Sequence, residues 1–456
     1  MIEVADKLEP WIAEHVRLEK GAPGAGLGWV RQLRKAGIDG FAEMGFPTTQ
    51  HEEWRQTSVA RIADTTFRAV ASAEARGKRV QGVERFFYPE AEAARLVFVD
   101  GHFSPGLSKI DALPTGVKVG TIAQLLAEDP TRLEGRIGTL VDAGSHPFVA
   151  LNTALFQDGG YVLVEKGVEL DRPVHVVYLA TADGEPTANG GPTANHPRTV
   201  LIAEPRSNAV FMETFAGVGE GASFTNAVTE TWIGAEARVH HVMLELATLE
   251  AFHMATHQVR LDRGSNLTTH SVSLGGALVR NELNTVLDGE GIWLQMYGMF
   301  RVDGTQHIDN HTSIDHPQPH SDSRELYKGL LDGNGKAIFH GKIIVRKDAQ
   351  LTNAYQENRN LLLSDEAIVD TKPQLEIHAN DVKCKHGANI GHVSEDHIHY
   401  LRTRGVGRED ARRILVHAFG AEMIQQLPVE AVRTRLAGMV YELLGGDPRD
   451  AILWGA

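Results

Sequence analysis

The chain has 456 residues, of which 42% are hydrophobic and 23% charged, and it contains no apolar run approaching the length of a membrane span. Its formal net charge of −14 argues against nucleic-acid binding through the phosphate backbone. A single cysteine excludes an internal disulfide framework, and the acidic start of the chain differs from a secretory signal. We therefore expect a folded cytoplasmic protein that binds neither nucleic acid nor membranes.

The first region, residues 1–155, has a mostly helical pattern. Two sets of apolar residues show helical spacing, Trp29, Val30 and Leu33 in the first and Ile62, Phe67, Val70 and Ala71 in the second. A further helix is expected at residues 122–126, ending near Pro130. This region is predicted to form an N-terminal helical flank.

Residues 156–390 change to short runs of β-branched residues separated by polar turns such as 287–289, 302–304 and 331–333. Such a series suits a sandwich, a barrel or a solenoid. Few two-residue hairpin turns are present, which disfavours a sandwich. Stretches rich in Asn and Thr suit the stacked corners of a β-helix, where side-chain amides form ladders. A β-helix core is therefore favoured.

The last region, residues 391–456, returns to helical periodicity with three amphipathic segments. The first begins after Ser394, a good N-cap, and ends near Gly405, and a third is expected to start at Pro428. The apolar face predicted for the middle helix consists of Ala411, Ile414, Leu415, Ala418 and Phe419. Such faces usually pack on their own protein, and the second interpretation is a docking surface for another chain.

Cys384 and His386 are the first candidates for chemistry, because residues two apart lie on the same side of an extended strand. They could share a metal or sulfur species there. Lys383 and Lys385 are expected to lower the pKa of the thiol somewhat. An isolated pair with this spacing is more often a buried cysteine next to an unrelated histidine.

His307, Asp309 and His311 are weaker candidates, since on a strand they would point one way and could form a two-histidine, one-carboxylate iron site. The same residues also suit solvated polar corners, and spacing alone leaves both interpretations open. Residues 329–337 superficially suggest a phosphate loop, but the spacing is wrong and Ala337 replaces the magnesium-binding hydroxyl, so we expect a turn.

Several motifs in fixed order resemble the SufD family. They are QHIDNHT (306–312), SRELYKG (323–329), FHGKI (339–343), NLLLSD (360–365), DTKPQLEI (370–377), DVKCKHG (381–387) and YLRTRG (400–405). The match is looser before residue 270, although GFPT (45–48) and Trp54 resemble the N-terminal signature of the family. Lys385 is a departure, because many relatives carry serine there.

The resemblance implies a right-handed parallel β-helix core flanked by N-terminal and C-terminal α-helical regions. It implies a non-catalytic scaffold subunit in a complex with SufB and two copies of the ATPase SufC, working in iron–sulfur cluster assembly, and a homodimer is conceivable without SufB. His386 and Cys384 map onto the family's residues at the SufB interface. They would hold iron or a transient cluster of the 4Fe-4S type, and the complex could carry reduced flavin.

The C-terminal helices, including Tyr400, Arg402, Arg404 and Phe419, are expected by the same resemblance to dock on SufC. The paralogue SufB is the nearest rival, but its members are usually longer and richer in cysteine. Two other classes stay open, a stand-alone non-haem metal enzyme using the histidines near residue 309 and a purely structural or carbohydrate-binding β-helix. The small aromatic content, 7%, gives little material for sugar stacking.

Overall fold

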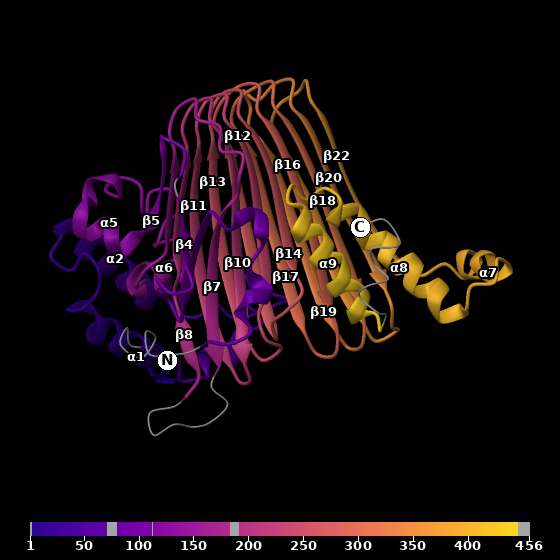
Figure 1. Cartoon of the computed structure of the whole chain (residues 1–456), viewed down its shortest axis with the longest axis horizontal. Helices are drawn as coiled ribbons and strands as arrows, with labels where there is room; N and C mark the ends of the chain where they lie inside the picture. Colours follow the sequence, from indigo (N-terminus) through magenta and orange to yellow (C-terminus); the bar gives the residue numbers. More distant parts are fainter. Residues whose placement is uncertain (1, 71–79, 112, 183–190, 446–456) are drawn as a thin grey trace.

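The computed structural model describes residues 2–70, 80–111, 113–182 and 191–445, and its centre is a β-helix of about seven turns (Figure 1). Successive strands alternate between two sheets, and within the helix each strand pairs in parallel with the strand two further along the chain. The expected β-helix flanked by helical regions is thus confirmed, with a flattened two-sheet cross-section.

The first sheet contains β1 (Arg68–Ala69), β5 (Val117–Thr121), β6 (Gly160–Val164), β8 (Thr193–Asn195), β9 (Arg198–Ala203), β11 (Ser223–Ile233), β13 (Phe252–Leu261), β15 (Leu278–Leu287), β17 (His307–His316), β19 (Lys336–Val345) and β21 (Ile368–Ile377). The second contains β2 (Ala94–Val99), β3 (His102–Phe103), β4 (Lys109–Ile110), β7 (Val174–Ala182), β10 (Asn208–Gly219), β12 (Arg238–Leu246), β14 (Asn266–Ser273), β16 (Trp293–Val302), β18 (Asp322–Leu331), β20 (Asn353–Leu362) and β22 (Lys383–His392). Strand β2 lies within the N-terminal stretch that has a mostly helical pattern, and it pairs in parallel with β7.

The corners of the β-helix stack on one another at a regular interval. Register partners Asn281 and Asn310 are 29 residues apart and joined through their side-chain amides, but they lie within β15 and β17, so the Asn- and Thr-rich stretches expected at the corners lie on strands instead. Gly304 and Gly333, at successive corners, both have φ of 56°, and a Cβ on Gly333 would lie 2.7 Å from the backbone nitrogen of Gly304. Only glycine fits such a left-handed, closely stacked corner. The glycine-rich segment near residue 333 is therefore a turn, as expected.

Side chains that point into the β-helix form ladders of register partners. Ile314 and Ile343 are one such pair, and both are fully buried. Because side chains alternate along a strand, the residues between these inward-pointing ones point outward. The side of the sheet on which a side chain lies therefore follows from its register partner.

Most of the N-terminal flank packs across one end and one face of the first sheet, whereas residues 83–91 pack against the second sheet. It comprises α1 (Ile2–Glu19), α2 (Gly28–Met44), η1 (Glu52–Trp54), α3 (Ala60–Ala63), η2 (Val83–Phe86), η3 (Pro89–Ala91), α5 (Ile122–Glu128), η4 (Pro130–Arg132) and α6 (Pro147–Leu155). A Cβ on Gly37 of α2 would lie 2.6 Å from the nitrogen of Ala154 in α6, so the missing side chain permits the close helix contact.

The helices expected near Val30 and at residues 122–126 are present as α2 and α5, whereas the helix expected from Ile62 to Ala71 is wrong over its described part. Helix α3 ends at Ala63, and strand β1 begins at Arg68. Ile62 is buried within α3 in the aromatic core of the flank, whereas Phe67 is buried in the same core outside any helix. Ala71 lies outside the described residues.

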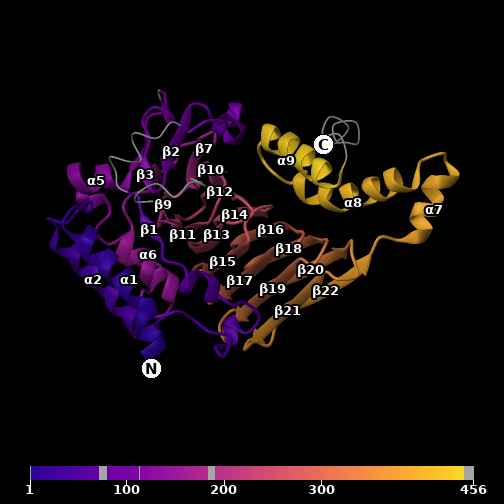
Figure 2. The same ribbon diagram turned by 90° about the horizontal axis from the view of Figure 1, so that it is seen from below.

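The C-terminal helices are α7 (Glu395–Thr403), α8 (Arg408–Ile424) and α9 (Glu430–Leu443). Figure 1 and Figure 2 show α9 beside the second sheet and α7 projecting away from the body of the molecule. Ser394 caps α7 as expected, but α9 begins two residues after Pro428. The buried face of α8 also differs from prediction, since Ala418 is exposed while Val416 and Met423 are buried. None of the described helices is both long and apolar enough to cross a membrane.

Candidate functional site

The last turn of the β-helix leaves an open end. Within the described residues β21 pairs only with β19, and β22 pairs only with β20, so each has one free edge. Free edges present unpaired backbone N–H and C=O groups that can add a further strand. Apolar side chains accompany them, because Ile368, Ile377 and Ile390 are 53%, 41% and 48% exposed.

Cys384 and His386 lie on β22 at this open end. Their register partners on β20 are Ala354 and Gln356, both of which are buried inside the β-helix. Cys384 and His386 therefore also face the interior side, the thiol half-buried against the core and the imidazole exposed where no further turn covers it. The strand thus brings both groups to one side, at the mouth of the β-helix.

A buried polar ladder lies in register behind His386. The side-chain amide of Gln356 donates to the carboxylate of Glu325 at 2.7 Å, and burial raises the pKa of Glu325 to about 7. The open end therefore has a polar group and a titratable carboxyl beneath it.

The pKa of the Cys384 thiol is raised, not lowered, which corrects the expectation from Lys383 and Lys385. Burial is the main cause, opposed by a hydrogen bond from the backbone of Ala354. Lys385 points to the other face of the strand, where its Nζ lies 5.8 Å from the centre of the Tyr355 ring. At neutral pH the free thiol is thus predominantly protonated.

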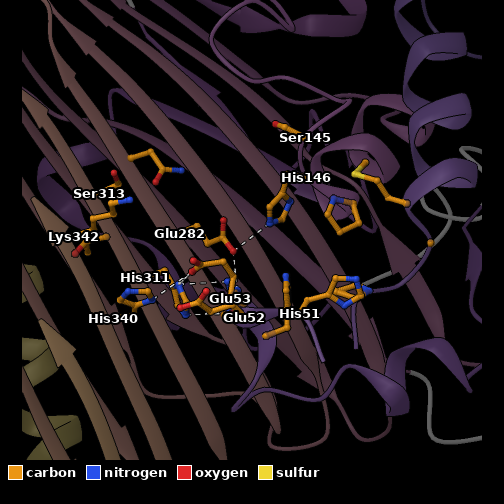
Figure 3. A pocket seen from close by; sticks show the side chains of 18 residues that line it. His51, Glu52, Glu53, Ser145, His146, Glu282, His311, Ser313, His340 and Lys342 are labelled. Atoms are coloured by element: carbon orange, nitrogen blue, oxygen red, sulfur yellow. Dashed lines mark hydrogen bonds and ion pairs between the residues drawn. The ribbon is translucent and has the colours of Figure 1, made fainter. Parts of the chain in front are cut away.

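A second site is a cavity of about 560 Å³ between residues 44–54 and the outer face of the first sheet (Figure 3). Glu282, His311 and His340 occupy successive turns of the β-helix in register and point outward into this cavity. Glu53, on η1, faces the two histidines. Its Oε2 lies 3.7 Å from Nδ1 of His311 and 3.4 Å from Nδ1 of His340.

Electrostatics favour the ionised form of Glu53. The hydrogen bond from His340 is the largest cause that lowers its pKa, with further contributions from the charges of His311 and Arg280. The Glu53 side chain is 60% exposed, whereas His311 and His340 are 14% and 11% exposed. This arrangement offers one carboxylate and two imidazoles at a solvent-accessible position.

Beneath the cavity, Arg280 anchors the N-terminal segment to the sheet. Its Nη1 donates to Asp309 Oδ2 at 2.6 Å and to the backbone oxygen of Glu53 at 2.8 Å, and its guanidinium lies 3.8 Å from the centre of the Trp54 ring. Thr57 also donates to Asp309, at 2.6 Å. These contacts hold Glu53 opposite the histidines.

A family model described as "SUF system FeS cluster assembly, SufBD core domain" matches residues 186–419, and another, "SufBD protein N-terminal region", matches residues 26–176. The chain belongs to the SufBD family. A SufBD family protein of Synechocystis sp. is 32% identical over 411 residues, covering 88% of each chain. The iron–sulfur cluster assembly protein SufD of Escherichia coli is 30% identical over 406 residues, 89% of this chain and 91% of the relative.

The resemblance to SufD drawn from the motifs is thus confirmed, and iron–sulfur cluster assembly is the process to which this SufBD protein belongs. A SufD protein of Bacillus subtilis is also similar, with 26% identity over 302 residues, 66% of this chain and 67% of the relative.

The SufBD protein brings His307, Asp309 and His311 to one outward face of β17, as alternation requires, but covers them with the N-terminal segment. His307 Nε2 lies 3.0 Å from the hydroxyl of Thr57. Although burial opposes it, the charges of His311 and Arg280 hold the pKa of Asp309 below its ordinary range. Asp309 Oδ2 already accepts hydrogen bonds from Arg280 and Thr57, so this oxygen holds the N-terminal segment on the sheet.

Among the expected docking residues, Tyr400, Arg402 and Arg404 are exposed on and just after α7. Phe419 instead packs on its own chain, where the buried Lys328 of β18 donates to its carbonyl oxygen at 2.9 Å and lies 4.5 Å from its ring centre.

Sequence reasoning missed Glu53 and His340. The 29-residue interval between the Asp-Gly corners at 303–304 and 332–333 was an available signal, because it places His340 one turn beyond His311. Nothing local connects Glu53 to these histidines, since η1 reaches them only through the packing of the N-terminal flank.

Proposed function

We propose that this protein is the SufD-type scaffold subunit of a complex with SufB and the ATPase SufC, and that it contributes ligands for iron or a nascent cluster at the SufB interface. The open end of the β-helix carries this proposal, because it combines free strand edges, exposed isoleucines and the thiol–imidazole pair. The chain acts as a non-catalytic cytoplasmic scaffold, and ATP hydrolysis belongs to SufC.

Pairing with the end of a second β-helix suits this surface physically. Strands β21 and β22 are both 10 residues long, so their backbone groups offer two extended ladders. Covering Ile368, Ile377 and Ile390, each about half exposed, would contribute roughly 1 kcal/mol per residue. Without SufB, the same edges could pair with a second copy of this chain.

At the covered interface His386 would supply a neutral imidazole nitrogen to iron or the cluster. Cys384 would act as a thiolate ligand or line the interface. Because burial raises the pKa of the thiol, its binding to a metal would release a proton at neutral pH. The cargo, a transient 4Fe-4S cluster or iron, would thus displace that proton.

Docking of SufC is assigned to the C-terminal helices. Support comes from the exposure of Tyr400 at 58%, together with the arginines at 402 and 404, on a helix that extends from the body of the molecule (Figure 2). Phe419 would then stabilise the attachment of α8 to the sheet, and transmit motion of the tail toward β18.

The test of assembly is co-expression with candidate SufB and SufC chains followed by mass measurement of the intact complex. We expect a complex containing all three chains. Recovery of this chain alone, under conditions in which SufB and SufC assemble with an established SufD, would refute the proposal.

The test of the site is His386→Ala within that complex, compared with His378→Ala, an exposed histidine in the connection between β21 and β22. We expect cluster formation to slow at least ten-fold in the first variant and to stay unchanged in the second. Equal rates for both would remove His386 from the proposal, and a normal rate for Cys384→Ser would leave Cys384 a packing residue.

A further inference from the structure

We propose that Glu53, His311 and His340 form a binding site for one divalent transition-metal ion such as Zn²⁺ or Fe²⁺, on the outer face of the first sheet. The site belongs to this chain alone and is separate from the open end that carries Cys384 and His386. It therefore goes beyond the proposed scaffold function (Figure 3).

The ligand atoms are already grouped at a distance that suits such an ion. One ligand atom from each of the three residues lies within 4.8 Å of the others. Bonds of about 2.0–2.1 Å to nitrogen and oxygen in a tetrahedral site put neighbouring ligand atoms about 3.4 Å apart. Glu53 Oε2 and His340 Nδ1 are 3.4 Å apart, and Glu53 Oε2 and His311 Nδ1 are 3.7 Å apart. These two distances require only a small contraction, and the two histidine nitrogens lie within 4.8 Å of each other.

The second nitrogen of each imidazole lies near an oxygen acceptor, although that of His311 also contacts Arg280. His340 Nε2 lies 3.4 Å from Oε1 of Gln374, and His311 Nε2 lies 2.9 Å from Oδ1 of Asp309. A proton on each Nε2 leaves the Nδ1 lone pairs directed at the proposed ion. Metal-binding histidines commonly donate their other N–H in this manner, which fixes the tautomer and the ring orientation.

Arg280 also contacts both ring nitrogens of His311, because its Nη1 lies 3.0 Å from Nε2 and its Nη2 lies 3.4 Å from Nδ1. Nη1 carries two hydrogens. The closer oxygens of Asp309 and of the Glu53 backbone, at 2.6 and 2.8 Å, compete with His311 for them. Metal binding through His311 Nδ1 therefore requires that the 3.4 Å contact with Arg280 be given up and that Nε2 donate to Asp309 Oδ1, which otherwise lacks a hydrogen-bond partner in the part of the chain that the structure describes.

The charge of the surroundings matches a divalent cation. Three carboxylates, Glu53, Glu282 and Asp309, surround the single guanidinium of Arg280, which ion-pairs with Glu282 at 2.7 Å and with Asp309 at 2.6 Å. With neutral imidazoles these four groups carry a net charge of about −2. Lys342 and Lys372, at the edge, are paired with Glu376 and Glu52. An ion of charge +2 would neutralise the group.

The cavity leaves coordination positions open. Three protein ligands and about 560 Å³ of accessible space resemble the arrangement in which a metal retains a water or a small ligand. The competing possibility is a metal-free cluster in which a protonated histidine forms an ion pair with Glu53. The two possibilities differ in whether the isolated chain takes up a stoichiometric metal.

The experiment uses Co²⁺ as a spectroscopic probe, added anaerobically to the full chain purified without a histidine tag. We expect one Co²⁺ per chain, with visible absorption bands of a low-coordinate site that disappear when Zn²⁺ is added. Glu53→Gln and His340→Gln should each weaken binding at least ten-fold. Glu53 is largely exposed, so its variant removes a ligand at little cost to folding.

Two control variants locate the ion. His378→Gln removes an exposed histidine outside the cavity, and Cys384→Ser combined with His386→Ala removes the open-end ligands. Both should bind Co²⁺ as the unaltered chain does. Absence of stoichiometric Co²⁺ in the unaltered chain, or equal binding by Glu53→Gln, would overturn the proposal. Loss of Co²⁺ binding only in the Cys384/His386 variant would show that the ion binds at the open end, which would also overturn the proposal.

Discussion

The guanidinium of Arg280 donates to the carboxylate of Asp309 at 2.6 Å, and both side chains are almost completely buried beneath the N-terminal segment. The pair joins β15 to β17 and, through the backbone oxygen of Glu53, joins both strands to η1. Removing one partner of a buried ion pair leaves an uncompensated charge, so the stability of the fold should depend strongly on both side chains.

Asp309→Asn should therefore lower the stability of the N-terminal flank by about 3 kcal/mol. The matched control is Asp315→Asn on the same strand, whose partner Arg346 is 54% exposed and whose loss should cost less than about 1 kcal/mol. Hydrogen exchange of residues 45–57 and urea denaturation midpoints would measure both effects. Similar losses for the two variants would contradict a buried anchor at Asp309.

Acidification below neutral pH should destabilise the protein. Burial lowers the pKa of four histidines to about 3, namely His175, His196, His253 and His270. The unfolded chain protonates them below about pH 6.5 while the folded chain does not, so stability is complete above that pH and falls as pH decreases. Glu245 and Glu325, whose pKa burial raises to about 7, and Asp158, whose pKa burial raises to about 6, oppose this effect but are fewer.

His253→Phe should reduce this pH dependence. Neither ring nitrogen of His253 has a hydrogen-bond partner among the described residues, and its ring centre lies 4.9 Å from that of Phe215. The substitution should flatten the stability profile between pH 6.5 and pH 4 by at most about 1.4 kcal/mol per pH unit. Urea midpoints across this pH range would measure the slope, and an unchanged slope would show that His253 is not the source.

The edge of β22 should control assembly with SufB. Ile390→Lys places a charge on an exposed apolar position of the last strand, and lysine at an edge opposes strand pairing. Leu249→Lys is the matched control, since Leu249 is 67% exposed in the connection between β12 and β13. We expect loss of the SufB complex only for the first variant in size-exclusion chromatography. Equal recovery of both complexes would remove this edge from the proposed interface.

The Cys384 thiol should react slowly with iodoacetamide at neutral pH, because burial raises its pKa and the thiolate is the nucleophile. Its rate should rise with pH through a midpoint above that of the urea-unfolded chain. The chain has one cysteine, so labelling followed by mass spectrometry reports this site without ambiguity. A midpoint below that of the unfolded chain would indicate activation by the neighbouring lysines instead.

The sequence by itself determined the β-helix and that Cys384 and His386 share one face of their strand. Both follow from local rules: the alternation of side chains along a strand, the short β-branched runs and the shortage of hairpin turns, whereas the Asn- and Thr-rich stretches lie on strands and not at corners. The motifs 306–312 and 381–387 were sufficient to indicate the family, because each is a continuous stretch of sequence that can be recognised without the fold.

Tertiary structure alone decided how the N-terminal segment contacts the sheet. Phe67 has the character of a helical core residue but is buried in an aromatic cluster outside any helix, and Ala418 lies on the exposed side of α8. The burial of Cys384, which raises its pKa, likewise depends on the turn beneath it. Glu53 lies beside His311 and His340 only because 29-residue turns stack the histidines and Arg280 holds η1 over them. These contacts join residues far apart in the chain, and no local pattern encodes them.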